Sequence, residues 1–358
     1  MKRTVFNEKS TSYKTKTYPL FFGEELGVYD TMNRNYPKLF ELYNQQMAKI
    51  WYSTEVNIDK DRIDMASYPK EVVDIMTKTI QWQTQTDSLA HAAVSILLPK
   101  YITNPELKSL VTAWGLFEDI HEQSYSDIVE NIFPKPMDML EDIATNKNLT
   151  ARSRVLIDTF DALYNLPDTA TISEKRKAVL LAMTAFYAME SISFMASFTI
   201  TFTIGHIKMF SGVAARVRFI ARDEQLHQHF AYEILRIMRD VEKYPEWNEM
   251  KPQMKHIIDS VRQQELEWIE YILRDGETVG ITKPFLREAV DFFSTPVYAK
   301  LGIDSPFELT WDNPIKHLNE YFDTSLIQTA SQEIQQTGYT IGALKDDMTD
   351  EMDLEFDL

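Results

Sequence analysis

The sequence predicts an all-α protein. Long stretches follow a helical pattern of apolar residues, alternating strand patterns are scarce, and the chain has only 10 glycines and no glycine-rich or serine-rich linker. A chain of 358 residues can bury a sizeable core, and all-helical chains of this size occur as single domains. We therefore expect long helices packed around one core.

Start and stop signals locate the individual helices. Asn104 is the expected N-cap of a helix with Pro105 at its first position, and this helix should end before Pro134. Thr171 and Glu174 have the spacing of a capping box that opens another long helix. The expected helices cover residues 33–51, about 67–99, 104–133, 171–210, 212–240, 246–274 and 284–300.

One helical stretch is apolar enough to span a membrane. Residues 178–205 contain a single charged side chain, that of Glu190. A membrane helix would carry this charge in the middle of the bilayer at a high cost, and the stretch is rich in serine and threonine. We therefore favour a helix buried on all sides within a bundle, with no membrane contact, in which Glu190 must pair, take up a proton or bind a cation.

Composition excludes several kinds of site and partner. The chain has no cysteine, so disulfides, thiolate metal sites and cysteine nucleophiles are excluded. Its net charge of −17 argues against nucleic-acid binding, which needs a basic surface. The first residues contain no apolar segment of a secretory signal, and we expect a cytoplasmic protein.

Two Glu-x-x-His motifs lie in the middle of predicted helices. Glu118 with His121, and Glu224 with His227, each share one helix face because residues three apart are neighbours on a helix. Taken singly, each Glu could be a surface acid and each His a core side chain. A helical bundle can also direct such a pair from each of two helices, and one carboxylate from each of two others, toward two metal ions.

Two further carboxylates complete this arrangement. Glu190 is one, and Asp87, an isolated acid in its own helix, is the other. The four negative charges of the carboxylates, with two neutral imidazoles, balance the charge of two divalent cations. Oxygen and imidazole donors of this kind suit iron, with manganese as the alternative. His91, one turn after Asp87, could be a seventh ligand, but we favour a role as a polar neighbour. The predicted ligands are Asp87, Glu118, His121, Glu190, Glu224 and His227.

Tyr125 lies one helical turn after His121 and should be close to the metal ions. A phenol beside a metal pair that activates dioxygen can be oxidised to a neutral radical, which survives only among dry, unreactive side chains. Phe194, Phe198 and Ile220 have the spacing to provide them. Alternatively, Tyr125 is an ordinary core tyrosine.

The C-terminal segment has the composition of a docking tail. The last thirteen residues carry seven acidic side chains and no basic one. Leu354, Phe356 and Leu358 could anchor a flexible segment that becomes ordered on a partner. The alternative is a tail that only improves solubility.

From about residue 18 to its end, the chain resembles the small, radical-generating subunit of class I ribonucleotide reductase. The resemblance rests on the order and spacing of the segments IWYSTEVNIDKDRIDM, TDSLAHA, WGLFEDIHEQSY, AMESISFMASF, FIARDEQLH and YILRDG. It implies a ferritin-like helical bundle over residues 1–338, a flexible tail over 339–358, and a homodimer. It also implies the dimetal ligands given above, a stable radical at Tyr125, and a large subunit that reduces ribonucleotides.

The resemblance also implies a route for the radical. Trp51 matches an interior tryptophan near the metal site, and Asp223 matches the acid that links this tryptophan to the metal-bound His121. Tyr339 matches the tail tyrosine at the subunit junction, and Glu333 matches a glutamate before it.

Two other classes of function remain open from the residues alone. A ferritin-like oxygenase or oxidase would act on its own substrate and would need a channel to the metals. A metal-storage protein would leave Tyr125 inert. One departure concerns Glu122, because many relatives have a small residue after the metal-site histidine.

Overall fold

A computed structural model describes residues 4–323 of the chain. The first compact unit of the chain ends at Phe322, and only Asp323 is described beyond it. The expected boundary between residues 338 and 339 lies outside the described residues and remains a prediction.

Helices account for the regular structure of this unit, as the sequence predicts. Residues 4–323 form no strand, and only two isolated bridges occur, Phe21 with Ile102 and Thr278 with Ile281. The α-helices are α1 (Ser12–Thr15), α2 (Pro37–Met47), α3 (Asp59–Ser67), α4 (Lys70–Ala92), α5 (Pro105–Ile132), α6 (Pro136–Thr145), α7 (Lys147–Arg152), α8 (Arg154–Tyr164), α9 (Ile172–Ala188), α10 (Phe194–His206), α11 (Ser211–Arg236), α12 (Trp247–Ile272), α13 (Lys283–Leu301) and α14 (Asn319–Phe322).

Three of these helices continue into π-helical turns, and short 3₁₀ turns occupy some connections. The π-helical turns are η2 (Ala93–Leu97) after α4, η4 (Met189–Ser193) between α9 and α10, and η5 (Ile237–Val241) after α11. The 3₁₀ turns are η1 (Ser53–Glu55), η3 (Leu98–Lys100) and η6 (Lys316–Leu318). A π turn inside a helix changes the direction of the side chains that follow it, and such turns are frequent at functional sites.

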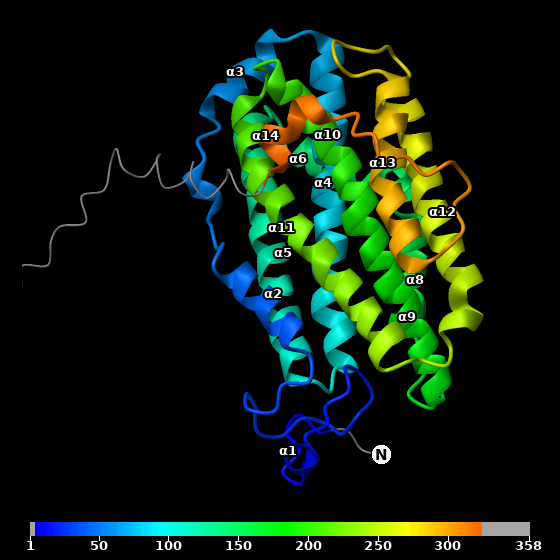
Figure 1. Cartoon of the computed structure of the whole chain (residues 1–358). Helices are drawn as coiled ribbons and strands as arrows, with labels where there is room; N and C mark the ends of the chain where they lie inside the picture. Colours follow the sequence, from blue (N-terminus) through cyan, green and yellow to red (C-terminus); the bar gives the residue numbers. More distant parts are fainter. Residues whose placement is uncertain (1–3, 324–358) are drawn as a thin grey trace, which may run out of the picture. The chain divides into compact units, whose positions relative to one another are not determined.

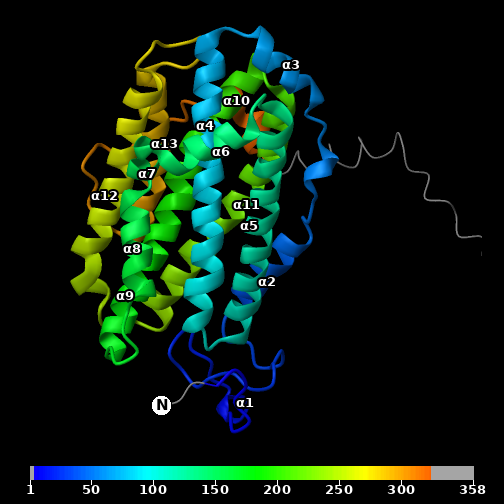
Figure 2. The same cartoon turned by 180° about the vertical axis from the view of Figure 1, so that it is seen from behind.

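The long helices run alongside one another as a bundle (Figure 1). Helix α5 packs against α2 and α4, α10 packs against α4 and α11, and α9 packs against α11 and α12. The view from behind shows α4 and α5 side by side along the length of the bundle (Figure 2). Four of these helices, or the turns that interrupt them, carry the predicted metal ligands.

Most of the predicted helix starts are confirmed. The Asn104 side chain accepts a hydrogen bond from the backbone N–H of Leu107 at 2.8 Å. Thr171 and Glu174 bond each other's backbone N–H groups, as a capping box requires. The expected start near residue 67 was wrong, because residue 67 ends α3 and Pro69, in an extended conformation, precedes α4.

The apolar stretch is buried inside the bundle. The continuous helix Ile172–His206 has a window of mean hydropathy 1.5, and 89% of that window is buried among other helices. Glu190 lies in the π turn at its middle and is fully buried. The stretch is therefore the central helix of the core, as the interrupting charge indicated.

Candidate metal centre

The six predicted ligands meet inside the bundle. They come from α4, α5, the π turn η4 and α11, so that segments far apart in the sequence contribute to one cluster. None of the six side chains is exposed to solvent. They are Asp87, Glu118, His121, Glu190, Glu224 and His227.

The donors fall into two overlapping groups. Asp87 and His121 belong to one group, and Glu190 and His227 belong to the other. Glu118 and Glu224 belong to both. Within each group, one donor atom from every residue lies within 4.8 Å of the others. This arrangement provides two adjacent cation sites with two carboxylates shared between them.

Both imidazoles direct Nδ1 toward the shared carboxylates. His121 Nδ1 lies 3.1 Å from Glu224 Oε1 and 3.4 Å from Asp87 Oδ1. His227 Nδ1 lies 2.7 Å from Glu224 Oε2 and 3.1 Å from Glu118 Oε1. The centroids of the two rings are 5.8 Å apart. One glutamate therefore contacts both imidazoles, as expected for a carboxylate that bridges two ions.

Many of the atoms in this cluster that could bind a metal ion have no hydrogen-bond partner among the described residues. Both carboxylate oxygens of Asp87 and both of Glu190 are buried and lack a hydrogen-bond partner. One oxygen of Glu118 and one of Glu224 lack a partner as well. Buried polar atoms without partners are costly, because they lose their hydration without compensation. Divalent cations would satisfy them, and the mixture of oxygen and imidazole donors fits a dinuclear metal site.

The electrostatics of the cluster also indicate a cation site. Burial raises the pKa of Asp87 and of Glu190, because an ionised carboxylate is poorly solvated there and other acids lie close by. Burial alone would lower the pKa of His227, but Glu224 and Glu118 raise it to about 9. Burial alone would raise the pKa of Glu224, but the nearby imidazoles of His227 and His121 lower it. Without cations, the cluster must retain protons to offset its negative charge.

Tyr125 lies beside this cluster and is fully buried. Its hydroxyl group has no hydrogen-bond partner among the described residues. Burial raises its pKa, and the negative charges of Asp87 and Glu224 raise it further. Phe194, Phe198 and Ile220 are also fully buried, and the two phenyl rings stack at 5.8 Å.

A chain of contacts joins the cluster to Trp51. The Trp51 indole N–H donates a 2.7 Å hydrogen bond to Asp223 Oδ2, and His121 Nε2 lies 3.3 Å from the same oxygen. Arg222 donates to the other Asp223 oxygen and to the backbone carbonyl of Lys49. The contacts that the resemblance implies between Trp51, Asp223 and His121 are therefore present.

Sequence reasoning missed three residues that hold the ligands in place. Trp114 donates to Glu118 Oε1 at 2.8 Å, and Gln228 donates to the backbone carbonyl of Glu190 at 3.1 Å. Arg222, described above, fixes Asp223. Trp114 lies one turn before Glu118 on α5, so helix spacing could have indicated it. No local pattern marks the other two.

His91, the possible seventh ligand, lies apart from the cluster. His91 belongs to neither ligand group, and its Nδ1 hydrogen-bonds Glu122 Oε2 at 2.7 Å. The tail residues lie outside the described residues, and their roles remain predictions. They are Glu333, Tyr339, Leu354, Phe356 and Leu358.

Comparisons with known proteins agree with this geometry. A family model described as "Ribonucleotide reductase, small chain" matches residues 29–314. The chain is 28% identical over 356 residues to ribonucleoside-diphosphate reductase 1 subunit beta of Escherichia coli O157:H7, covering 93% of this chain and 94% of that protein. It is 26% identical over 387 residues to the beta subunit of phage T4, covering 99% and 98%.

Solved structures share the fold. The ribonucleotide reductase R2 subunit from Clostridium botulinum matches with a TM-score of 0.80 at 18% identity, covering 90% of this chain and 98% of that chain. The dimanganese(II) NrdF protein of Streptococcus sanguinis matches with a TM-score of 0.68 at 16% identity, covering 84% and 100%. These similarities confirm that the bundle is of the ferritin-like type seen in R2 proteins.

Proposed function

The chain belongs to the ribonucleotide reductase small-chain family, and from this membership we propose how its residues serve the reductase. As a ribonucleoside-diphosphate reductase beta subunit, it is an oxidoreductase component. It generates and stores a radical at Tyr125, and this radical is passed to a large subunit that reduces ribonucleotides. The described part of the chain supplies the metal site, the tyrosine and the first step of the transfer route.

The observation that carries this proposal is the pair of overlapping ligand groups that share Glu118 and Glu224. Asp87 and His121 complete one ion's ligands, and Glu190 and His227 complete the other's. Two iron ions fit this set best, and two manganese ions fit the same donors. The bound pair supplies the oxidising equivalent, taken from dioxygen.

Tyr125 is the group that stores this equivalent. Its hydroxyl group is buried and has no hydrogen-bond partner among the described residues, so no described side chain holds its proton. The negative charges of the carboxylates act on this phenol. Tyr125 would give one electron to the oxidised metal pair and its hydroxyl proton to a neighbouring carboxylate such as Asp87, and would remain as a neutral radical. Phe194, Phe198 and Ile220 exclude water and reactive side chains from its surroundings.

Transfer to the partner starts at Trp51. Asp223 connects the indole to His121, so an electron can leave Trp51 while the charge at Asp223 stabilises the hole. Tyr339 continues this route to the large subunit, and Glu333, Leu354, Phe356 and Leu358 bind that subunit. The protein acts as a homodimer in the cytoplasm.

Nothing specific favours the alternative of an oxygenase with its own substrate. Such an enzyme needs a channel that ends at the metals. Neither the surface cavity beside His91 nor the one beside Asp74 is lined by any of the six proposed ligands.

Electron paramagnetic resonance tests the proposal. Full-length protein loaded with Fe²⁺ and exposed to air should show a narrow organic-radical signal, and Tyr125→Phe should abolish the signal while retaining both metal ions. Tyr164→Phe is the matched control, because Tyr164 is 60% exposed at the end of α8. A signal that persists in Tyr125→Phe, or no signal with either iron or manganese, would contradict the radical role.

A further inference from the structure

Three more donor side chains meet outside the buried cluster, at the seam between α4 and α5. They are His91, Asp119 and Glu122, and one donor atom from each lies within 4.8 Å of the others. The closest pair is His91 Nδ1 and Glu122 Oε2, at 2.7 Å. The proposed radical function uses none of these three residues.

The two helices approach closely at this seam. A Cβ atom added at Gly115 of α5 would lie 2.8 Å from the hydroxyl oxygen of Ser95 in η2, so the two segments come close at this point. Ser95 lies one turn after His91, and Asp119 lies one turn after Gly115. The backbone spacing therefore holds the three donors together on facing sides of two rigid helices.

The donors carry negative charge that the described residues do not neutralise. No lysine or arginine in residues 4–323 lies within ion-pair distance of Asp119 or Glu122. Asp119 accepts one hydrogen bond, from the Gln123 side chain at 2.8 Å. Two carboxylates and a neutral imidazole would balance one divalent cation. A bound cation would take the place of the contact between His91 Nδ1 and Glu122 Oε2.

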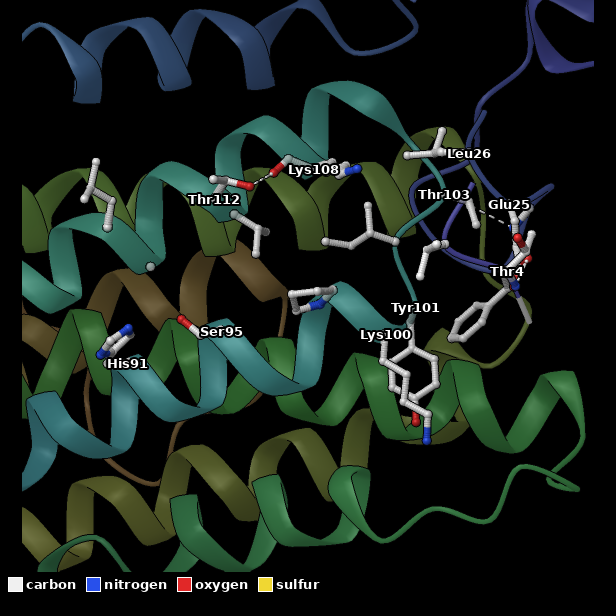
Figure 3. Close-up of a pocket in the computed structure, with 18 of the residues that line it drawn as sticks. Thr4, Glu25, Leu26, His91, Ser95, Lys100, Tyr101, Thr103, Lys108 and Thr112 are labelled. Carbon is white, nitrogen blue, oxygen red and sulfur yellow. Dashed lines mark hydrogen bonds between the residues drawn. The ribbon is translucent and has the colours of Figure 1, made fainter. Parts of the chain in front are cut away.

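Solvent and ions can reach the cluster. The His91 and Glu122 side chains are 28% and 30% exposed. His91, Gly115 and Asp119 line a surface cavity of about 870 Å³, and Figure 3 shows His91 of α4 and Ser95 of η2, one turn later, along its wall. This space can accommodate the water ligands that a three-donor site needs to complete its coordination.

We propose that His91, Asp119 and Glu122 form a separate, solvent-facing site for one divalent transition-metal ion of the Mn²⁺ or Fe²⁺ type. The nitrogen donor selects such an ion over Mg²⁺ and Ca²⁺, which prefer oxygen donors alone. The site is distinct from the buried centre, because it shares no ligand with either buried group. Its exposure makes it the weaker and more readily exchanged of the metal sites.

Equilibrium dialysis of the metal-free, full-length protein against Mn²⁺ alone tests this site. Wild-type protein should bind three ions per chain, two that survive desalting and one that is lost, in agreement with the three donor groups. His91→Gln/Glu122→Gln should bind two ions, and Asp119→Asn should weaken the third by at least about tenfold. Glu130→Gln, an exposed acid on the same helix, is the control and should retain three.

The outcomes separate this inference from the proposed radical function. Two ions in wild-type protein, with no change in the double variant, would overturn the outer site and leave the buried centre intact. Displacement of the third ion by millimolar Mg²⁺ would also overturn it, because a site selected by imidazole should retain Mn²⁺. Crystals soaked in Mn²⁺ should show a third anomalous peak between His91 and Asp119, and its absence at full occupancy of the other two would contradict the proposal. Glu190→Ala should lose tightly bound ions and retain the exchangeable one, even if the radical never forms.

Discussion

Asp223 is the residue on which the contacts between the metal ligands and Trp51 converge. One of its oxygens contacts both the Trp51 indole and His121, and Arg222 holds the other. A partner of this kind orients the ligand and sets its basicity. Asp223 joins Trp51 to His121 through hydrogen bonds, and the centroids of the indole and imidazole rings lie 6.3 Å apart, so this carboxylate serves both positioning and transfer.

Trp51→Phe tests the transfer role at the scale of one residue. It removes the indole N–H and the oxidisable ring but no metal ligand. We expect normal metal content and a normal Tyr125 radical, with nucleotide reduction lowered by about tenfold to hundredfold. The same change at Trp311, which is 66% exposed, should leave reduction intact. Full reductase activity in Trp51→Phe would exclude this route.

Glu190→Ala tests the ligand set. Glu190 belongs to only one of the two donor groups, and neither of its oxygens has another partner among the described residues. After desalting, metal analysis should give well below two tightly bound ions per chain, whereas Glu130→Ala should give two. Two retained ions in Glu190→Ala would remove this residue from the ligand set.

The six proposed ligands could be selected from the sequence because each stands out in its local context. Glu118 and His121 share a helix face, and an isolated Glu190 inside an apolar helix requires a partner. Trp51 and Asp223 could be identified only through the family resemblance, since an indole and an acid that are 172 residues apart leave no local pattern. Arg222 was not predicted, because its role is to hold a neighbour of a ligand.

At the scale of the element, helix starts were easier to predict than interruptions. Asn104 and Thr171 act as caps through hydrogen bonds to residues three positions away, which the sequence displays directly. The π turn around Glu190 depends on a backbone bonding pattern that packing imposes, so the sequence predicted one continuous helix there. The turn nevertheless places Glu190 in the cluster.

A buried ion pair joins α7 to α12. Arg152, at the end of α7, donates to both oxygens of Glu265 on α12, at 2.9 and 2.5 Å. Its guanidinium also lies 3.5 Å from the ring centroid of Trp82 on α4. One side chain thus contacts three helices in a site with almost no solvent exposure.

Arg152→Met should therefore destabilise the fold, by about 3–5 kcal/mol, because Glu265 would remain buried without its partner. Burial raises the pKa of Glu265 even beside Arg152, so loss of the arginine strengthens that effect. Urea unfolding of the metal-free protein measures the change. The double variant Arg152→Met/Glu265→Leu should recover most of the loss, and a double variant as unstable as the single one would contradict this explanation.

At the scale of the whole molecule, radical formation and nucleotide reduction should be separable. The metal ligands and Tyr125 lie within the described unit, whereas Tyr339 and the apolar tail residues lie beyond it. Deletion of residues 339–358 should leave the radical signal intact and abolish nucleotide reduction in the presence of the large subunit. Deletion of residues 354–358 alone should weaken binding but retain Tyr339. An unaffected reductase assay after the longer deletion would exclude a docking role.

The all-α class of the molecule could be predicted from composition and periodicity. The burial of residues 178–205 inside the bundle could be inferred because Glu190, their single charged residue, would be costly in a membrane. What the sequence could not provide is the order in which helices pack, because α9 contacts α12 and α4 contacts α10 through side chains far apart in the chain. The family resemblance implied a ferritin-like bundle but did not specify these helix neighbours.

The two carboxylates held in common by both donor groups also determine how the protein fills with metal. A first ion would fix Glu118 and Glu224 in the orientation that a second ion needs, so the second should bind more readily than the first. A preparation given one equivalent of iron should therefore contain mostly fully loaded and empty chains, with few that hold a single ion. Specific activity should then follow the fraction of chains that are completely filled, and average iron content would measure that fraction directly.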